Sequence, residues 1–300
     1  PDLLARSPPA VVSPSLGSLL LRLNKLIVRI NDYPLACHSG QFIRYIFENV
    51  ALIVRRRVAE QGGDAAAELR VVGETEAVLF PVFQEILNKQ QEDLMAYVLQ
   101  IMALLLEAAP GEISQTYIML FNAVLAPTNW DMAGNVPGLV RLLQAYLRKG
   151  TSQLLAMDSN LVLRIVNVAE TLAGSRRTEQ SGIKLFIGLA EALDLQLLRP
   201  HLPVILRLSL KRLKASWPRP PVRRFALPIM DLLSVLVGKH GVGVLKEGLR
   251  DTSLLHAIQK GFWADTLPKI QSSGRRKAGI IATTRMLVED ESIWADAELV

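Results

Sequence analysis

Hydrophobic residues recur along most of this chain at intervals of three and four, the spacing that lines one face of an α-helix. The pattern is clear in residues 15–31, where leucines and isoleucines share one face and Arg22, Lys25 and Arg29 occupy another. The alternation of apolar and polar residues that is typical of a half-buried strand is hard to find anywhere. The sequence therefore predicts an all-α fold.

Turn residues separate the periodic segments and set the limits of the expected helices. These helices cover residues 15–31, 39–60, 74–89, 93–108, 113–125, 135–149, 159–173, 179–193, 202–214, 221–239, 242–261 and 275–288. Pro81 and Pro228 predict kinks, and a break is expected within the helix at 242–261. The proline-rich residues 1–14 predict a linker or the tail of a preceding repeat, and residues 61–70, with two glycines and three alanines, predict a loop.

The helix at 135–149 has the best-defined ends. The Asn135 side chain is expected to cap it by accepting a backbone N–H, and Pro137 falls in the first turn, where no donor is needed. Gly150 is expected to end the helix in the left-handed conformation.

The helices also show a longer period. Every second helix starts near residue 39, 93, 135, 179, 221 or 275. Three of these intervals are about 43 residues, within the range of HEAT-type helix pairs. Each pair has an apolar face that it cannot bury alone, so the pairs must stack. We expect residues 15–300 to form a right-handed α-solenoid of about six antiparallel helix pairs.

Composition narrows the class of protein. Half of the 300 residues are apolar, which is enough for a sizeable core. The only cysteine, Cys37, excludes an intrachain disulfide and fits a reducing compartment. The longest uncharged stretch, residues 113–130, is too polar for a membrane span. The chain starts at Pro1 without a leader pattern and stops within a predicted helix, so we expect a fragment of a longer soluble protein.

The charge is uneven. Residues 1–150 hold 13 Lys and Arg against 14 Asp and Glu, whereas residues 151–300 hold 21 against 14, so the formal net charge of +6 is concentrated in the second half. A basic face there favours an acidic protein surface or nucleic acid as a partner.

Few residues suggest a metal, phosphate-binding or catalytic site. The four histidines are scattered and have no metal-ligand spacing, so no metal site is expected. The glycines at 238–248 follow a helix and lack the ending of a phosphate-binding loop, which favours an interhelical turn. No acid, base and nucleophile stand at a catalytic spacing. We expect no catalytic residue, no cofactor and no enzymatic activity.

A basic stripe in the second half is the candidate binding site. Arg207, Lys211 and Lys214 stand at i, i+4 and i+7, well round the helix from its leucines, and Arg223 and Arg224 follow in sequence. The stripe is either a solvated face or a partner-binding surface. A second basic run, residues 275–277, starts a helix and opposes its dipole, so it needs an anionic neighbour or water.

The segment at 79–150 carries a specific likeness. It contains a Gly-Asn-Val-Pro-x-Leu-Val-Arg-Leu-Leu-Gln-Ala-Tyr-Leu block. The block consists of Gly134, Asn135, Val136, Pro137, Leu139, Val140, Arg141, Leu142, Leu143, Gln144, Ala145, Tyr146 and Leu147. The segment resembles the exportin-2 (CAS) family of nuclear export receptors, within the importin-β or karyopherin family. The resemblance is strong over residues 39–150, and beyond them only the helical rhythm and the late basic run persist.

The resemblance implies a C-terminal HEAT-repeat region that binds importin-α cooperatively with RanGTP and returns it to the cytoplasm. Importin-α, RanGTP and nucleoporins are the partners it implies, and shuttling between nucleus and cytoplasm is the implied location. In that family the inner helices contact the partners. If the helix at 135–149 is an outer helix, as the resemblance suggests, counting helices places 202–214 in the inner row. Its stripe would then meet importin-α, because a positive stripe favours an acidic surface.

Two other functions share parts of this pattern. A HEAT-repeat scaffold unrelated to transport has the same architecture but lacks the block within 79–150. A nucleic-acid-binding helical repeat would use the basic half, although Trp217, Phe225 and Trp263 do not form a regular stacking series.

Overall fold

The computed structural model describes residue 6 and residues 13–33, 40–216, 223–249 and 258–290, and all structural statements refer to these. They form helices and contain no strand, which confirms the predicted all-α class. The chain divides into two compact units, residues 1–153 (unit 1) and 154–300 (unit 2). Each unit is described by itself.

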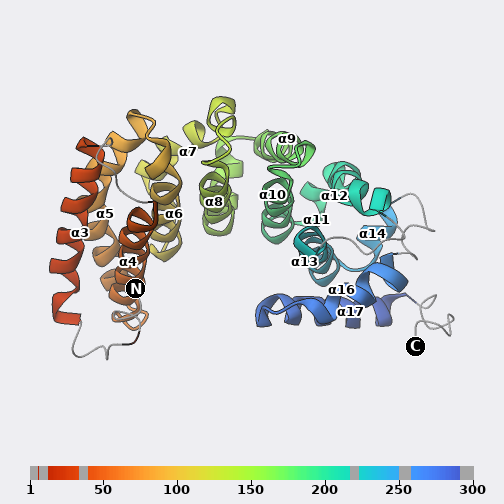
Figure 1. Ribbon diagram of the computed structural model, residues 1–300. Coiled ribbons are helices and arrows are strands. Elements are labelled where there is room, and N and C mark those ends of the chain that lie inside the picture. The colour runs from red at the N-terminus through yellow and green to blue at the C-terminus, as the bar shows by residue number, and fades with distance from the viewer. Residues whose placement is uncertain (1–5, 7–12, 34–39, 217–222, 250–257, 291–300) are drawn as a thin grey trace. The chain divides into compact units, whose positions relative to one another are not determined.

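Unit 1 is built from successive helices joined by short turns. Its helices are α3 (Leu16–Asp32), α4 (Gly40–Ala59), α5 (Ala65–Asn88), α6 (Glu92–Ala108), α7 (Gln115–Val124) and α8 (Val136–Met157), with short 3₁₀ turns η1 (Ser13–Ser15) and η2 (Pro127–Trp130). They lie in two rows: α3, α5 and α7 form the first row, and α4, α6 and α8 form the second (Figure 1). This alternation is the expected arrangement of stacked helix pairs.

A connected group of aromatic rings fills the core of unit 1. Phe80 of α5 meets Tyr117 of α7 edge to face, with ring centroids 5.9 Å apart. The Tyr146 ring of α8 lies 6.0 Å from the Tyr117 ring and 4.9 Å from the Phe121 ring. Edge-to-face contacts of this kind stabilise a core beyond the area that they bury. The rings thus join both rows of unit 1.

Glycine lets two helices of the second row approach closely. A Cβ on Gly138 of α8 would lie 2.8 Å from the Ala96 backbone oxygen of α6. No larger residue fits there without moving one of the helices. Gly138 therefore sets the spacing between α6 and α8.

Unit 2 repeats the two-row arrangement. It contains α9 (Leu161–Gly174), α10 (Glu179–Ala192), α11 (Leu195–Leu198), η3 (Arg199–His201), α12 (Leu202–Ser216), α13 (Arg223–His240), α14 (Gly243–Gly248), the π-helical η4 (Ile258–Trp263), α16 (Ala264–Thr266), η5 (Leu267–Lys269) and α17 (Ser273–Glu289). Its first row is α9, α12 and α14, and its second row is α10, α13 and α17 (Figure 1). Its core consists mainly of leucine, isoleucine and valine side chains.

The long period of the sequence corresponds to the second rows. Their helices begin at Gly40, Glu92, Val136, Glu179, Arg223 and Ser273, close to the starts that the sequence predicts. The HEAT-type solenoid fold is therefore confirmed. The handedness of the superhelix stays a prediction.

The prediction of a loop over residues 61–70 is wrong for most of that range. Only a tight turn with Gly62 and Gly63 at positive φ separates α4 from α5. The Asp64 carboxylate accepts hydrogen bonds from the backbone N–H groups of Ala66 and Ala67 at 3.0 and 3.3 Å, which caps α5. The three alanines start the helix because alanine is the best helix former.

Both predicted ends of the helix at 135–149 also need correction, although Pro137 does fall in its first turn. The buried Asn135 side chain does not cap α8, because its Nδ2 faces the sulfurs of Met95 and Met132 at 3.6 Å each and its Oδ1 accepts no hydrogen bond among the described residues. Gly150 has φ −151° and ψ 45°, so it is not left-handed, and α8 resumes beyond it to Met157.

The remaining predicted helices are present with shifts of a few residues at their ends. Pro81 and Pro228 lie inside α5 and α13. The helix expected at 242–261 is short α14, followed by residues 250–257, which lie outside the described ranges, and then η4. Cys37 and most of residues 1–14 also lie outside them.

Candidate partner-binding surfaces

The basic stripe is partly visible on α12. Arg207 is exposed, with 65% of its side chain accessible, and its Nη2 lies 3.5 Å from Oε1 of Glu170 on α9. Lys211 is also exposed. The side chains of Lys214, Arg223 and Arg224 lie outside the described part of the chain. An exposed ion pair of this length contributes little to stability.

The basic stripe lies in the first row of unit 2. α12 lies beside α9 there, whereas α10, α13 and α17 pack against one another more extensively in the second row. That the helix at 202–214 belongs to an inner row stays a prediction.

The basic start of α17 has the anionic neighbour that the sequence requires. The Nη1 atom of Arg275 lies 3.0 Å from Oδ2 of Asp231 on α13. Asp231 is 8% exposed, and its burial raises the pKa of the carboxyl group, an effect that the Arg275 charge partly opposes. Arg276 donates to the Ile270 backbone oxygen at 3.0 and 2.6 Å. These contacts satisfy two of the three cations in the run.

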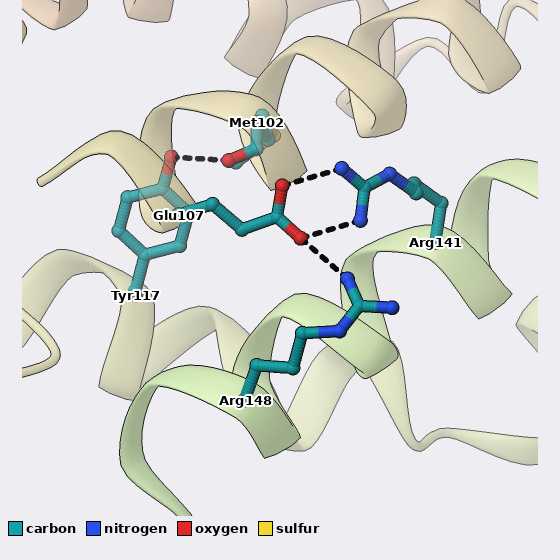
Figure 2. A network of polar contacts seen from close by, with 5 residues as sticks. All are labelled: Met102, Glu107, Tyr117, Arg141 and Arg148. Atoms are coloured by element: carbon teal, nitrogen blue, oxygen red, sulfur yellow. Dashed lines mark hydrogen bonds and ion pairs between the residues drawn. The ribbon is translucent and has the colours of Figure 1, made fainter. Parts of the chain in front are cut away.

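A polar network links α6 to α8 in unit 1, and sequence reasoning missed it. Figure 2 shows the Glu107 carboxylate contacting both Arg141, by two parallel hydrogen bonds, and Arg148 at 2.8 Å. An acid in the last turn of a helix opposes the helix dipole, so Glu107 needs cations. Arg141 and Arg148 stand seven residues apart on one face of α8, which is the signal that the sequence held.

Cations also cap the carboxyl ends of helices in the second rows. Lys149 of α8 donates to the Ala109 backbone oxygen at the end of α6. Lys239 of α13 donates to the backbone oxygens of Glu191 and Leu193, at the end of α10, at 2.7 and 2.8 Å. Arg285 of α17 donates to the Gly238 backbone oxygen in α13 at 3.1 Å. Helix ends expose carbonyl oxygens that such donors satisfy.

The second row of unit 1 offers a surface that suits a protein partner. Tyr45 of α4 is 43% exposed, and Arg44 beside it pairs with Glu48 at 2.6 Å. Further along the row lie half-buried Tyr97 on α6, which stacks on Phe47 at 5.3 Å, and the Glu107 network. Tyrosine and arginine are enriched among the residues that dominate protein–protein binding. We call the set formed by Tyr45, Tyr97 and the Glu107 network the Tyr45–Glu107 surface. This surface and the α12 stripe are the two candidate partner-binding surfaces.

The described residues form neither a membrane-spanning helix nor a metal-binding cluster. None of their helices combines the length and hydrophobicity needed to cross a lipid bilayer. Their histidine, cysteine, aspartate and glutamate side chains do not gather in any group of three or more that would hold a metal ion.

Comparison with known proteins identifies the family. The sequence model of the family described as "CAS/CSE protein, C-terminus" matches residues 9–299. The chain belongs to the CAS/CSE family. This confirms the resemblance that the block at 134–147 indicated, and extends it through the second half.

Relatives in the CAS/CSE family carry the name exportin-2. The protein from Danio rerio is 31% identical over 236 residues, 79% of this chain and 23% of the relative. The protein from Pagrus major is 27% identical over 278 residues, 93% of this chain and 27% of the relative. The human protein is 26% identical over the same length. The chain thus spans 23% to 27% of the length of these relatives.

A solved structure has the same fold. It is described as the exportin Cse1 in its cargo-free, cytoplasmic state, and it matches 97% of this chain with a TM-score of 0.73 and 20% identity. The match covers 29% of the Cse1 chain. At this identity the comparison concerns the fold, and it supports the HEAT-type stacking of helix pairs.

Proposed function

We propose that this chain is part of a nuclear export receptor that binds importin-α cooperatively with RanGTP. The observation that carries the proposal is the CAS/CSE family match over residues 9–299, together with relatives named exportin-2. Residues 15–300 then form a HEAT-repeat segment of a longer receptor that shuttles between nucleus and cytoplasm. Nucleoporins are further partners of this proposal.

The proposed mechanism is coupled binding without chemistry. A solenoid whose repeats contact only their neighbours changes curvature through small shifts at each interface. One partner that holds the favoured curvature raises the affinity for the other, and the coupling is reciprocal. The chain itself needs no catalytic group for this role, and we expect no turnover of nucleotide, peptide or ester.

The Tyr45–Glu107 surface supports this role better than the α12 stripe does. It lies on the closely packed second row, and its arginine and tyrosine side chains are half-buried or exposed. Contact of Arg207, Lys211, Lys214, Arg223 and Arg224 with importin-α stays a prediction. The nearby Glu170 favours a solvated face for the stripe.

The test uses a chimera, because the chain spans only part of its relatives. The aligned C-terminal region of Danio rerio exportin-2 is replaced by this chain, and importin-α binding is measured with GTP-loaded or GDP-loaded Ran. We expect at least about tenfold tighter binding with GTP, a coupling within the range usual for two linked sites. Equal affinity with both forms of Ran, in a chimera whose helical content is intact, would argue against the proposal.

Two variants of the chimera separate the surfaces. Charge reversal of Arg207 and Lys211 to Glu tests the α12 stripe, and Arg148→Glu with Tyr45→Ala tests the second-row surface. If the stripe binds importin-α, its variant weakens binding, and the loss shrinks as salt rises. Steeply salt-dependent binding to DNA or RNA, without Ran-dependent binding of importin-α, would instead favour the nucleic-acid alternative.

A further inference from the structure

Helix α3 carries three cations on its exposed face. Arg22, Lys25 and Arg29 stand at i, i+3 and i+7, a spacing that places them on one side of a helix, and all three are exposed. None of them forms an ion pair with a described residue, and the only acid of α3 is Asp32, its last residue. The three cations therefore form a positive ridge, which we call the α3 ridge.

Large apolar side chains flank the α3 ridge on both sides. On one side, Leu21 is 51% exposed and Val28 is 36% exposed. On the other side, Leu26 is 38% exposed and Tyr33 is 65% exposed. The members of each pair stand seven residues apart, about two helical turns, so each pair follows the ridge along the helix. α3 thus exposes positive charge and apolar surface together.

The exposed side chains are not needed to hold α3 in unit 1. The opposite face of α3 packs on α4 and α5, and α3 stands at the end of the first row (Figure 1). That face is lined by four side chains that are each at most 4% exposed: Leu16, Leu20, Ile27 and Ile30. The solvent face of an amphipathic helix is usually polar, and apolar surface that gathers on it marks an interaction site. The composition of the exposed face of α3 therefore suits binding.

We propose that the α3 ridge and its apolar flanks bind an acidic segment of a partner protein that also carries apolar side chains. Carboxylates of this segment pair with the three cations, because complementary charge selects the partner and its register. Apolar side chains of the segment cover the two flanks, as in other complexes in which an amphipathic segment lies along a helical surface. α3 belongs to neither candidate surface described above, so the proposal does not depend on the binding of importin-α.

A lipid surface fits the same face less well. A helix that lies on a membrane buries one apolar face and keeps its cations on the opposite face. On α3 the cations occupy the middle of the exposed face, between Leu21 and Val28 on one side and Leu26 and Tyr33 on the other. Lipid headgroups would meet the ridge first and leave the flanks in water. A protein segment, in contrast, is able to contact the ridge and both flanks at once.

The first experiment measures the binding of synthetic peptides by fluorescence anisotropy. The probe peptide is a short helix with glutamates at i, i+3 and i+7 and leucines on both sides of them. One control peptide replaces the leucines with alanine, and the other replaces the glutamates with lysine. We expect the probe to bind at least about tenfold more tightly than either control, with an affinity that falls as salt rises. Equal binding of the probe and the alanine control would show recognition of charge alone and overturn the proposal.

Two charge-reversal variants locate the binding surface. Arg22→Glu with Lys25→Glu reverses most of the α3 ridge and is expected to weaken binding of the probe by at least about tenfold. The matched control, Arg176→Glu with Arg177→Glu, makes the same change in net charge at two exposed positions of unit 2 and is expected to weaken it by less than about twofold. All four substitutions replace exposed side chains, so native helical content is expected. Equal losses in both variants would mean that only net charge matters, which contradicts the proposal.

A second pair of variants tests the flanks. Leu21→Ser with Leu26→Ser is expected to weaken binding of the probe by about tenfold, because apolar contacts on both sides of the ridge are lost. Met119→Ser on α7, where the side chain is 68% exposed, is the control and is expected to change the affinity by less than about twofold. Unchanged affinity in the flank variant would show that the leucines do not contact the probe, and the proposal would fail.

The last arm of the experiment compares other occupants of the same face. In the chimera with Danio rerio exportin-2 the probe is expected to bind as tightly as it does to the chain alone. Loss of binding in the chimera would show that the preceding part of the receptor covers α3, and would overturn the proposal. So would binding to phosphatidylserine vesicles that the variant with Arg22→Glu and Lys25→Glu abolishes, if the probe peptide does not bind.

Discussion

At the scale of single residues, one carboxylate holds two arginines in unit 1. Glu107 is 24% exposed, and it contacts Arg141, at 35% exposure, and Arg148, at 45%. Parallel hydrogen bonds between a guanidinium and a carboxylate are among the stronger polar contacts in proteins. The pair also joins two helices rather than two turns of one helix. We therefore expect Glu107 to contribute more to the free energy of unfolding than exposed acidic side chains do.

The first prediction concerns Glu107→Gln. The change removes the charge that both guanidiniums contact and is expected to lower the free energy of unfolding by about 1 to 2 kcal/mol. The control, Glu170→Gln, removes the exposed contact with Arg207 and is expected to change it by less than about 0.5 kcal/mol. Urea denaturation of the three proteins checks this. Equal effects of the two substitutions would mean that the network is no stronger than a surface pair.

The second prediction concerns two buried phenols. The hydroxyl of Tyr117 donates to the Met102 backbone oxygen at 2.9 Å, and that of Tyr146 donates to the Tyr117 backbone oxygen at 2.7 Å. Burial raises the pKa of both phenols well above the ordinary value, and the nearby Glu76 carboxylate adds to the effect at Tyr117. The folded state therefore keeps both protons at a pH where the unfolded chain loses them.

The sign of the pH dependence follows. Both states are protonated below about pH 10, so stability there does not depend on these groups. As pH rises further, the unfolded state binds fewer protons, and the free energy of unfolding falls by up to about 1.4 kcal/mol per pH unit for each phenol. The variant with Tyr117→Phe and Tyr146→Phe is expected to lose this part of the slope. Identical slopes above pH 10 for both proteins would contradict the prediction.

At the level of single residues, the sequence predicted a contact only where the need for it arises within one helix. The need of residues 275–277 for an anion followed from the helix dipole, and Asp231 meets it. The partners of Glu107 were not predictable, because they depend on the register between α6 and α8, which a close approach at Gly138 sets. Asn135 failed as a cap since two methionine sulfurs surround its amide.

At the scale of helices, two glycines have opposite roles. A Cβ on Gly138 would lie 2.8 Å from the Ala96 backbone oxygen and 3.1 Å from the Leu99 Cβ, whereas a Cβ on Gly73 of α5 would meet nothing within 4 Å. The first glycine allows close packing of α6 on α8. The second only weakens its own helix, because glycine is a poor helix former.

The third prediction uses this contrast. Gly138→Ala is expected to lower the free energy of unfolding by about 1 to 3 kcal/mol, because helices must separate to admit the methyl group. Gly73→Ala is expected to raise it by about 0.5 to 1 kcal/mol. Thermal and urea unfolding of both variants check the signs. A stabilising Gly138→Ala would show that α6 and α8 tolerate a wider spacing.

Helix boundaries were predictable wherever a strong signal stood alone, and the errors came from competing signals. At 61–70 the two glycines and three alanines suggested one loop, but Asp64 divides them by capping α5. At Gly150 the glycine suggested a stop, but contacts with Ile113 hold the chain in a bend from which the helix resumes. In both places a tertiary or capping contact decided the outcome.

At the scale of the whole chain, the repeat was the most predictable feature, since its period follows from spacing along the sequence. The starts of the second-row helices fall close to the predicted ones. The row to which α12 belongs was not predictable in the same way. A periodic pattern shows that helices alternate between two rows, but it does not show which row a given helix joins. A single contact, such as Arg141 of α8 with Glu107 of α6, fixes the order of the rows in unit 1.

The last prediction concerns how the chain unfolds. Each compact unit has a core of its own, aromatic in unit 1 and largely aliphatic in unit 2. Stability in repeat proteins is carried by neighbouring repeats, so a change in one unit is expected to leave the other largely unaffected. Unfolding of the whole chain should therefore depart from two-state behaviour.

Two buried tryptophans report on the units separately: Trp130 in unit 1 and Trp263 in unit 2. In proteins that keep one of them, with the other three tryptophans replaced by phenylalanine, fluorescence follows unfolding in urea. Gly138→Ala is expected to move the Trp130 midpoint to lower urea and to leave the Trp263 midpoint in place. If both midpoints shift together, the two units unfold as one cooperative block, and the energetic coupling along the stack extends farther than neighbouring repeats.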